Sequence, residues 1–248
     1  MKPVVLIPTY NESLNIVSLL SSLENLRREM PFRVVVIDDN SPDGTANIVD
    51  NLDLDWVRVM RRTRKDGLGN AYRAAITEAI ESNQFSHIVT MDSDGSHRVE
   101  DLHLMFASAD KDELSVTLGT RWMPGGRVVN WPKYRQFLSK AGTAYARKVL
   151  GIPLRDLTGG FRIYSVAILK KLKINEMTAN GYCFQIEMAL ASDLAGAVFV
   201  EVPITFIERV NGLSKMSKNI VIEALVQTTL WGLNRALRPN ADKLHYVK

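Results

Sequence analysis

The sequence predicts an α/β fold with a mostly parallel central sheet and helices on both faces. Over the first 120 residues, short apolar segments rich in β-branched residues alternate with segments of helical periodicity. The apolar segments are continuous, which is typical of parallel strands that are buried on both faces. A polar cluster follows each of the first four apolar segments, and ligands of such sheets bind at the carboxyl ends of the strands.

Each expected element follows from its own pattern. The strands of the first half are expected at residues 4–7, 32–37, 57–60, 87–91 and 114–118. The helices between them are expected at residues 15–28, 45–52, 71–80 and 99–109. In the first helix, apolar residues recur at helical spacing: Ile16, Leu19, Leu20, Leu23 and Leu26.

The second half of the chain is less regular. Its helices are expected at residues 133–150, 185–194 and 219–237. A turn into a strand is expected at residues 156–164. Two short strands, residues 198–202 and 204–208, flank Pro203, which cannot donate to a ladder and therefore favours the edge of a sheet.

The composition is that of an ordinary globular protein. The chain has 248 residues, 46% of them hydrophobic and 23% charged, which is enough for one large domain. The first apolar run is too short for a secretory signal, and no stretch reaches the roughly 18 apolar residues of a spanning helix. The single cysteine, Cys183, forms no internal disulfide, which suits a cytoplasmic setting. We expect a soluble or peripheral protein with a domain of residues 1–218, followed by an amphipathic helix and tail (219–248) for contact with a membrane surface or a partner.

Positive charge is concentrated in one stretch. Residues 115–155 contain eight basic residues, five aromatic residues and no acidic residue. Such a stretch favours an anionic partner, which could be phosphate groups, a lipid surface or nucleic acid. No nucleic-acid-binding module is recognised beneath it, so nucleic acid is not expected as a partner. The remaining alternative is a solvated basic face.

Two carboxylates close the fourth expected strand. Asp92 and Asp94 are separated by Ser93, at a point where the chain turns, so both can reach one divalent ion. Mg²⁺ is bound in proteins by one or two carboxylates together with substrate phosphates, and it can neutralise a departing diphosphate. The pattern alone is as typical of a plain turn, but its place at a strand end favours the metal site.

Three further motifs lie near strand ends. Asp39 closes the second strand, where it can accept hydrogen bonds from a base or a ribose, and the Pro-Asp-Gly turn after it is compatible with that role. Residues 67–69 (Gly-Leu-Gly) open a helix but lack the third glycine of the dinucleotide-binding fingerprint, which we reject. His97 has no identifiable partner, and we expect it to be structural.

Residues that suit a phosphate group lie beyond the fifth strand. Arg121 follows that strand directly, and Arg135 and Ser139 lie four residues apart on an expected helix, so they share a face. Forked guanidinium donors fit phosphate oxygens. A plain surface position is the alternative for each arginine.

Together these segments resemble glycosyltransferase family 2 and, within it, the dolichol-phosphate (polyprenol-phosphate) mannose synthases. The matching segments span most of the chain: residues 8–12 (PTYNE), 38–45 (DDNSPDGT), 65–72 (KDGLGNAY), 91–97 (MDSDGSH), 119–122 (GTRW), 156–164 (DLTGGFRIY), 181–188 (GYCFQIEM) and 202–217 (VPITFIERVNGLSKMS). The last three are the most specific to enzymes that act on polyprenol phosphates. The resemblance implies a GT-A fold. Within the family, it is to the type of mannose synthase that has no transmembrane helices.

The resemblance also implies roles for individual residues. The nucleotide would be held by Pro8, Tyr10, Glu12, Ile37 and Asp39. The metal, Mg²⁺ or Mn²⁺, and the diphosphate would be held by Asp92, Ser93 and Asp94. The donor phosphates would also be bound by Arg121, Arg209 and Lys215. The acceptor phosphate would be received by Arg121, Arg135 and Ser139. The expected catalytic residues are Asp94, Arg121 and Arg135.

The implied reaction is an inverting transfer of mannose from GDP-mannose to a polyprenyl monophosphate, at the cytoplasmic face of a membrane. A phosphate monoester is largely dianionic at neutral pH, so no general base is required. Ser93 stands where the family often has alanine, which is a mild change. Ser96 stands where some relatives carry a metal-contacting glutamine, which leaves the full metal coordination open. The type without membrane helices is compatible with a separate membrane-anchoring protein. The alternatives are transfer of glucose or another sugar from a UDP-sugar, a sugar-nucleotide nucleotidyltransferase, and a non-catalytic binding subunit.

Overall fold

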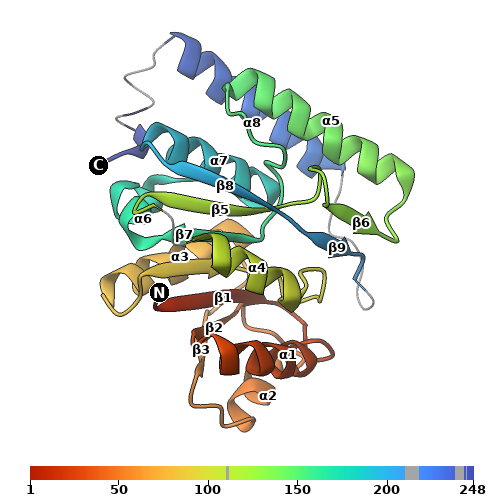
Figure 1. Ribbon diagram of the computed structural model, residues 1–248, viewed down its shortest axis with the longest axis vertical. Helices are drawn as coiled ribbons and strands as arrows, with labels where there is room; N and C mark the ends of the chain where they lie inside the picture. Colours follow the sequence, from red (N-terminus) through yellow and green to blue (C-terminus); the bar gives the residue numbers. More distant parts are fainter. Residues whose placement is uncertain (110–111, 210–217, 238–242, 244) are drawn as a thin grey trace.

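The central sheet of the protein has seven strands, in the order β3-β2-β1-β4-β7-β5-β8 (Figure 1). The computed structural model describes residues 1–109, 112–209, 218–237, 243 and 245–248. In spatial order the strands are β3 (Val57–Arg61), β2 (Arg33–Asp38), β1 (Pro3–Thr9), β4 (His87–Thr90), β7 (Arg162–Ser165), β5 (Ser115–Thr120) and β8 (Val198–Pro203). All neighbouring strands are parallel except the two pairs that β7 makes with β4 and β5. The predicted fold class is therefore confirmed.

Helices cover both faces of this sheet. They are α1 (Ile16–Glu29), α2 (Thr45–Asn51), α3 (Leu68–Glu81), α4 (Val99–Ala109), α5 (Lys133–Leu150), α6 (Val166–Lys171), α7 (Gly181–Leu194) and α8 (Lys218–Leu237). Neighbouring residues of a strand point to opposite faces. Val4 and Leu6 of β1 belong to the core cluster that contains α3 and α7, whereas Val5 and Ile7 belong to the cluster that contains α1 and α4. This burial on both faces explains the continuous apolar strands.

The elements lie close to their predicted positions, with a few differences. The helix expected at residues 71–80 begins at Leu68, directly after Gly67, and the helix expected from residue 185 begins at Gly181. Three short elements were not predicted: β6 (Arg127–Val129), α6 and a 3-10 turn, η1 (Ile174–Glu176). β6 pairs with β9 (Thr205–Ile207) in a second, two-stranded sheet. β8 lies at the edge of the main sheet, as Pro203 predicted.

α5 and α8 lie side by side at one end of the molecule, and α1 and α2 lie at the other end (Figure 1). Gly232 of α8 allows this close approach, because a Cβ there would lie 2.2 Å from Cγ1 and 2.9 Å from the carbonyl oxygen of Val149 on α5. α8 also packs against α7 and buries Trp231. The chain end returns to the core, where the amide of Lys173 donates to the carbonyl of Tyr246 (2.9 Å). Within the described residues, no helix has the length and apolar character to cross a membrane.

Candidate active site

Loops at the carboxyl ends of β1, β2, β4 and β5 enclose a cleft of about 390 Å³. Because β7 is antiparallel, it begins at the same edge, and Gly159 and Gly160 before it also line the cleft. The predicted site residues that line it are Pro8, Tyr10, Glu12, Asp39, Asp92, Ser93, Asp94, Arg121, Arg135 and Arg209. The fold therefore brings residues from most of the chain into one cavity.

Two other predicted residues, Ile37 and Ser139, do not line this cleft. The side chain of Ile37 is fully buried and packs in the core with α3, and its role in holding the nucleotide stays a prediction. The alternating faces of β2 explain this, because Ile37 points into the sheet's apolar layer. Ser139 lies one turn beyond Arg135 on α5 and lines a second pocket. Lys215 lies outside the described residues.

Hydrogen bonds hold the loops after β1 and β2 together. Asp38 accepts from the hydroxyl of Thr9 (3.0 Å) and the amide of Ser41 (2.9 Å). The amide of Glu12 donates to the hydroxyl of Thr45 (3.0 Å) at the start of α2. Asp38 therefore shapes the loop, and this leaves the neighbouring carboxylate, Asp39, to line the cleft.

Asp39 has a partner that the sequence analysis did not identify. Arg62, just after β3, donates to Asp39 (2.6 Å) and also to Asp66. Burial raises the pKa of the Asp39 carboxyl above its usual value, and Arg62 only partly offsets this effect. In the sequence, the basic cluster that follows the third strand was the signal that could have identified Arg62. Asp39 is therefore a buried acceptor of hydrogen bonds at the β2 end of the cleft.

The segment Asp92-Ser93-Asp94 is fixed by contacts on both sides. The hydroxyl of Ser93 donates to the carbonyl of Pro8 (3.1 Å), and Asp94 accepts from the amide of Ser96 (3.0 Å). The amide of Asp92 donates to Nδ1 of His97 (3.0 Å), whose ring stacks on Phe161 at 4.6 Å between centroids. His97 is buried and also forms a β-bridge with Phe206, next to the small sheet. It holds the loop in place, which is a structural role.

The donor atoms of this segment fit a hard divalent cation. Asp92 and Asp94 both line the cleft with carboxylate oxygens, the ligand type that Mg²⁺ and Mn²⁺ prefer. Among the described residues, no cluster of three or more His, Cys, Asp or Glu side chains could hold a metal by itself. Ser96 is buried and is not part of the cleft lining. A cation here would take its remaining ligands from substrate phosphates and water. Arg209 pairs with Asp94 at 3.1 Å and supplies a positive charge at the same place.

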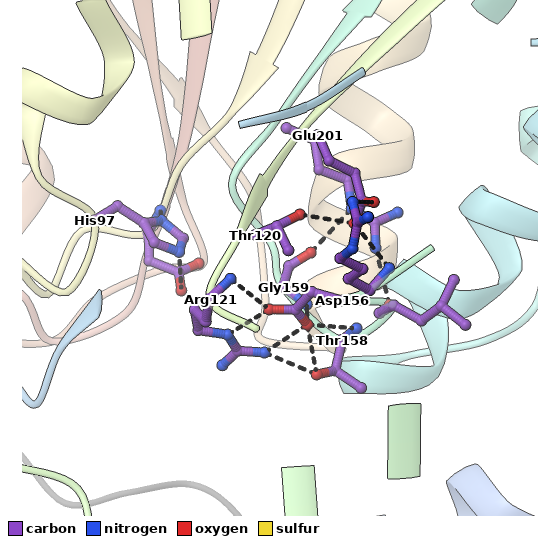
Figure 2. A network of polar contacts seen from close by, with 11 residues as sticks. His97, Thr120, Arg121, Asp156, Thr158, Gly159 and Glu201 are labelled. Atoms are coloured by element: carbon purple, nitrogen blue, oxygen red, sulfur yellow. Dashed lines mark hydrogen bonds and ion pairs between the residues drawn. The ribbon is translucent and has the colours of Figure 1, made fainter. Parts of the chain in front are cut away.

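Arg121 is held by a buried carboxylate. Asp156 accepts from Nε (2.6 Å) and Nη2 (2.8 Å) of Arg121, and Thr158 also accepts from Nη2 (2.8 Å), as Figure 2 shows. Burial alone would raise the pKa of Asp156, but the Arg121 guanidinium outweighs burial and holds that pKa below its usual value. The sequence analysis included Asp156 in a matching segment but gave it no role. The fork of Arg121 is thus fixed before any ligand binds.

Arg135 lines the same cleft as the carboxylates and is also paired. Its Nη1 donates to both oxygens of Glu208 (2.8 and 2.5 Å), and its guanidinium lies 4.0 Å from the ring centroid of Trp131. Glu208 follows β9, and its role was not predicted. Because the next residue, Arg209, pairs with Asp94, the chain after β9 contacts both the arginine side and the carboxylate side of the cleft.

A second, mostly apolar pocket continues from the arginines. It lies between α5, α7 and α8 and has a volume of about 90 Å³. It shares Arg121, Trp131, Arg135 and Thr158 with the first cleft. Its other lining residues are Leu138, Ser139, Gly142, Tyr145, Ile186, Val221, Ala224, Leu225 and Thr228. The cleft that carries the charged residues and an apolar pocket therefore meet at the two arginines.

A mostly parallel sheet with paired carboxylates and arginines in the cleft at its carboxyl edge is the arrangement expected of the GT-A class of glycosyltransferases. The chain belongs to glycosyl transferase family 2, whose family model matches residues 4–173.

The chain is similar to named proteins over almost its full length. It is 42% identical over 236 residues to the undecaprenyl-phosphate mannosyltransferase of Micrococcus luteus, covering 94% of this chain and 95% of that one. It is 39% identical over 239 residues to the polyprenol monophosphomannose synthase of Mycolicibacterium smegmatis, covering 95% and 89%.

Solved structures share the fold at low sequence identity. Mannosyl-3-phosphoglycerate synthase from Rubrobacter xylanophilus superposes with a TM-score of 0.65 at 14% identity, covering 97% of this chain and 75% of that one. Glucosyl-3-phosphoglycerate synthase from Mycobacterium tuberculosis, in complex with Mn²⁺, UDP and phosphoglyceric acid, also gives 0.65, at 17% identity and with coverage of 94% and 77%. At these identities the likeness concerns the fold alone.

Proposed function

We propose that this protein transfers a mannosyl group from GDP-mannose to the phosphate of a polyprenyl monophosphate. The relatives named above, at about 40% identity over most of the chain, are a mannosyltransferase and a mannose synthase of polyprenyl phosphates. The observation that carries the proposal within the structure is the junction of the two cavities. A polyprenyl phosphate has one anionic end and one apolar chain, and the arginines stand where the cleft that carries the charged residues meets an apolar pocket.

The donor occupies the carboxylate half of the cleft in this proposal. Pro8, Tyr10, Glu12 and Asp39 hold the nucleotide, and Arg209 and Lys215 bind its phosphates. Ser93 and Asp92 lie at the diphosphate. Bound at Asp92 and Asp94, Mg²⁺ or Mn²⁺ would polarise the diphosphate and neutralise its charge as it leaves.

The acceptor phosphate lies at Arg121, Arg135 and Ser139. A phosphate oxygen of the acceptor attacks the anomeric carbon, the bond from that carbon to the diphosphate oxygen breaks, and GDP leaves with the bonding electrons, which inverts the configuration. No proton needs to be removed, since the acceptor is already an anion. The arginines supply orientation and charge neutralisation, and pre-paired guanidinium groups lose little freedom when they bind phosphate. Asp156 and Glu208 keep these arginines in place beforehand.

The acceptor implies a membrane, and the α5–α8 end of the molecule suits peripheral binding to its cytoplasmic face. Exposed apolar side chains gather on these two helices: Tyr134, Phe137, Leu138, Ile222, Leu225, Val226, Leu230, Leu233 and Leu237. α5 also carries four exposed basic residues, Lys133, Lys140, Arg147 and Lys148, and no acidic residue. Apolar and basic side chains together favour an anionic lipid surface. A separate membrane-anchoring protein is an additional candidate for the same surface.

The reaction is tested with purified protein, radiolabelled GDP-mannose, polyprenyl phosphate and Mg²⁺ or Mn²⁺. The proposal expects a metal-dependent, organic-extractable product that releases mannose in mild acid. Label transferred from UDP-glucose but not from GDP-mannose would overturn the donor. No transfer from either donor, with lipid and metal present, would overturn the activity.

Binding to lipid vesicles is expected to increase with anionic lipid and to decrease with salt, because exposed charges are screened over about 10 Å at 0.1 M ionic strength. Phe137 on α5 is 71% exposed, and Phe137→Ser should weaken sedimentation with the vesicles several-fold. The matched control is Leu14→Ser, since Leu14 is 79% exposed and lies just before α1 in the sequence, the helix that lies at the other end of the molecule (Figure 1). Equal binding by both variants, or binding that ignores salt and lipid charge, would contradict this membrane face.

A further inference from the structure

Gln185 on α7 has a buried side-chain amide at the wall of the cleft. It is 3% exposed, yet it lines the cleft. Neither Nε2 nor Oε1 has a hydrogen-bond partner within the residues that the structure describes. Buried side-chain amides almost always have partners, so an unpartnered amide at a cavity wall indicates a ligand with polar groups.

The amide of Gln185 faces the same open space as the carboxylate of Asp92. A Cβ added at Gly160 would lie 3.4 Å from Nε2 of Gln185 and 3.8 Å from Oδ1 of Asp92. Any larger residue at position 160 would therefore fill the space between them. Thr158, two residues earlier, contacts Arg121. The space above Gly159 and Gly160 thus lies between the diphosphate end and the acceptor end of the cleft.

The walls of this space are held rigidly. Arg162 is fully buried, and it donates to the backbone carbonyl of Gln185 (2.7 Å) and to the backbone carbonyl of Gly159 (2.9 Å). Thr90 of β4 donates to the carbonyl of Gly160 (2.7 Å). One buried guanidinium therefore joins the turn of α7 that carries Gln185 to the segment before β7. A site whose supporting groups are already bonded is preorganised for its ligand.

We infer that Gln185 recognises the hydroxyl groups of the hexose that is transferred. This inference rests on the proposed function and adds to it the residue that distinguishes a nucleotide sugar from a bare nucleotide. A side-chain amide offers two donor hydrogens and one acceptor oxygen, which match neighbouring hydroxyls that both donate and accept. The amide is neutral, so it adds no charge beside Asp92 and Asp94.

The test compares two affinities in one protein by titration calorimetry in the presence of Mn²⁺. The wild type is titrated with GDP-mannose, GDP, UDP-glucose and UDP. Gln185→Met keeps the length of the side chain and removes its hydrogen bonds. For the donor that the wild type binds, the affinity ratio of sugar nucleotide to nucleotide should fall about tenfold or more, because a site built for a hydroxyl discriminates strongly. The affinity for the nucleotide alone should change less than about twofold.

The control variant is Gln84→Met, at an exposed position between α3 and β4, and its ratio should equal that of the wild type. An unchanged ratio in Gln185→Met, or equal losses for sugar nucleotide and nucleotide, would overturn the role of Gln185. A different outcome would overturn the proposed function. A wild type that binds UDP-glucose in preference to GDP-mannose overturns the mannosyl donor, while the ratio of UDP-glucose to UDP still tests Gln185.

Discussion

Replacement of Asp94 by alanine is expected to lower the kcat of mannosyl transfer by at least about a hundredfold, the usual effect of removing one group that stabilises charge in a transition state. The change removes one of the two carboxylates that line the cleft for a divalent cation. It also leaves Arg209 without its ion-pair partner. The affinity for Mn²⁺, measured by calorimetry in the presence of GDP, should fall together with kcat.

Asp55→Ala is the matched control for this change. Asp55 is exposed and precedes β3, at the amino edge of the sheet and away from the cleft. Its kcat and Mn²⁺ affinity should equal those of the wild type. Full metal-dependent activity in Asp94→Ala would remove Asp94 from the metal site.

Asp156→Asn is expected to be the most destabilising single change near the cleft. It keeps the shape of the side chain but leaves the Arg121 cation buried without its carboxylate, and breaking a buried pair in this way costs about 3–5 kcal/mol. The free energy of unfolding, measured in urea, should fall by that amount. Transfer activity should also fall, because Arg121 loses the contacts that fix its fork (Figure 2).

Glu201→Gln provides the comparison for this prediction. Glu201 pairs with Arg155 at 3.1 Å, and the Arg155 side chain is 52% exposed. Gln keeps the Oε1 atom that accepts from the Thr120 hydroxyl and the Arg155 amide, so the loss of the charge alone should cost less than about 1 kcal/mol. Similar costs for the two variants would contradict the assignment of Asp156 as the residue that holds Arg121.

The stability that the Asp156–Arg121 ion pair contributes should also depend on pH. The pKa of the Asp156 carboxyl is lowered in the folded state. Its contribution to the free energy of unfolding is therefore fully present above the unfolded pKa of about 3.9 and is lost as the pH falls through the lower, folded pKa.

The gathering of polar residues at one edge of the sheet could be predicted, because it depends only on the direction of the strands. Apolar strands separated by helices run parallel, so the clusters after β1, β2 and β4 had to share an edge. The same reasoning could not identify Asp156 or Glu208. Their partners, Arg121 and Arg135, lie 35 and 73 residues away in the sequence, and such pairs exist only after the chain has folded.

The elements that were missed share a physical cause. β6 and η1 have three residues each and α6 has six, too few for a periodic pattern to stand out. β6 forms only because β9, far along the chain, supplies its partner. The direction of β7 was equally hidden, since all its residues are buried, as are those of its neighbours β4 and β5, and burial does not reveal direction. The resemblance gave Ile37 a role in holding the nucleotide, and the alternation of β2 places its side chain in the core.

β7 also determines how far apart the two halves of the reaction lie. The order β4-β7-β5 separates the ends that carry Asp94 and Arg121 by two strand spacings, roughly 10 Å. If Asp94 holds the leaving diphosphate and Arg121 holds the acceptor phosphate, as proposed, donor and acceptor meet over the glycines before β7, which lie between these two strand ends. An insertion that added one more strand between β4 and β5 would then separate the two sites by about another 5 Å without altering a residue of either.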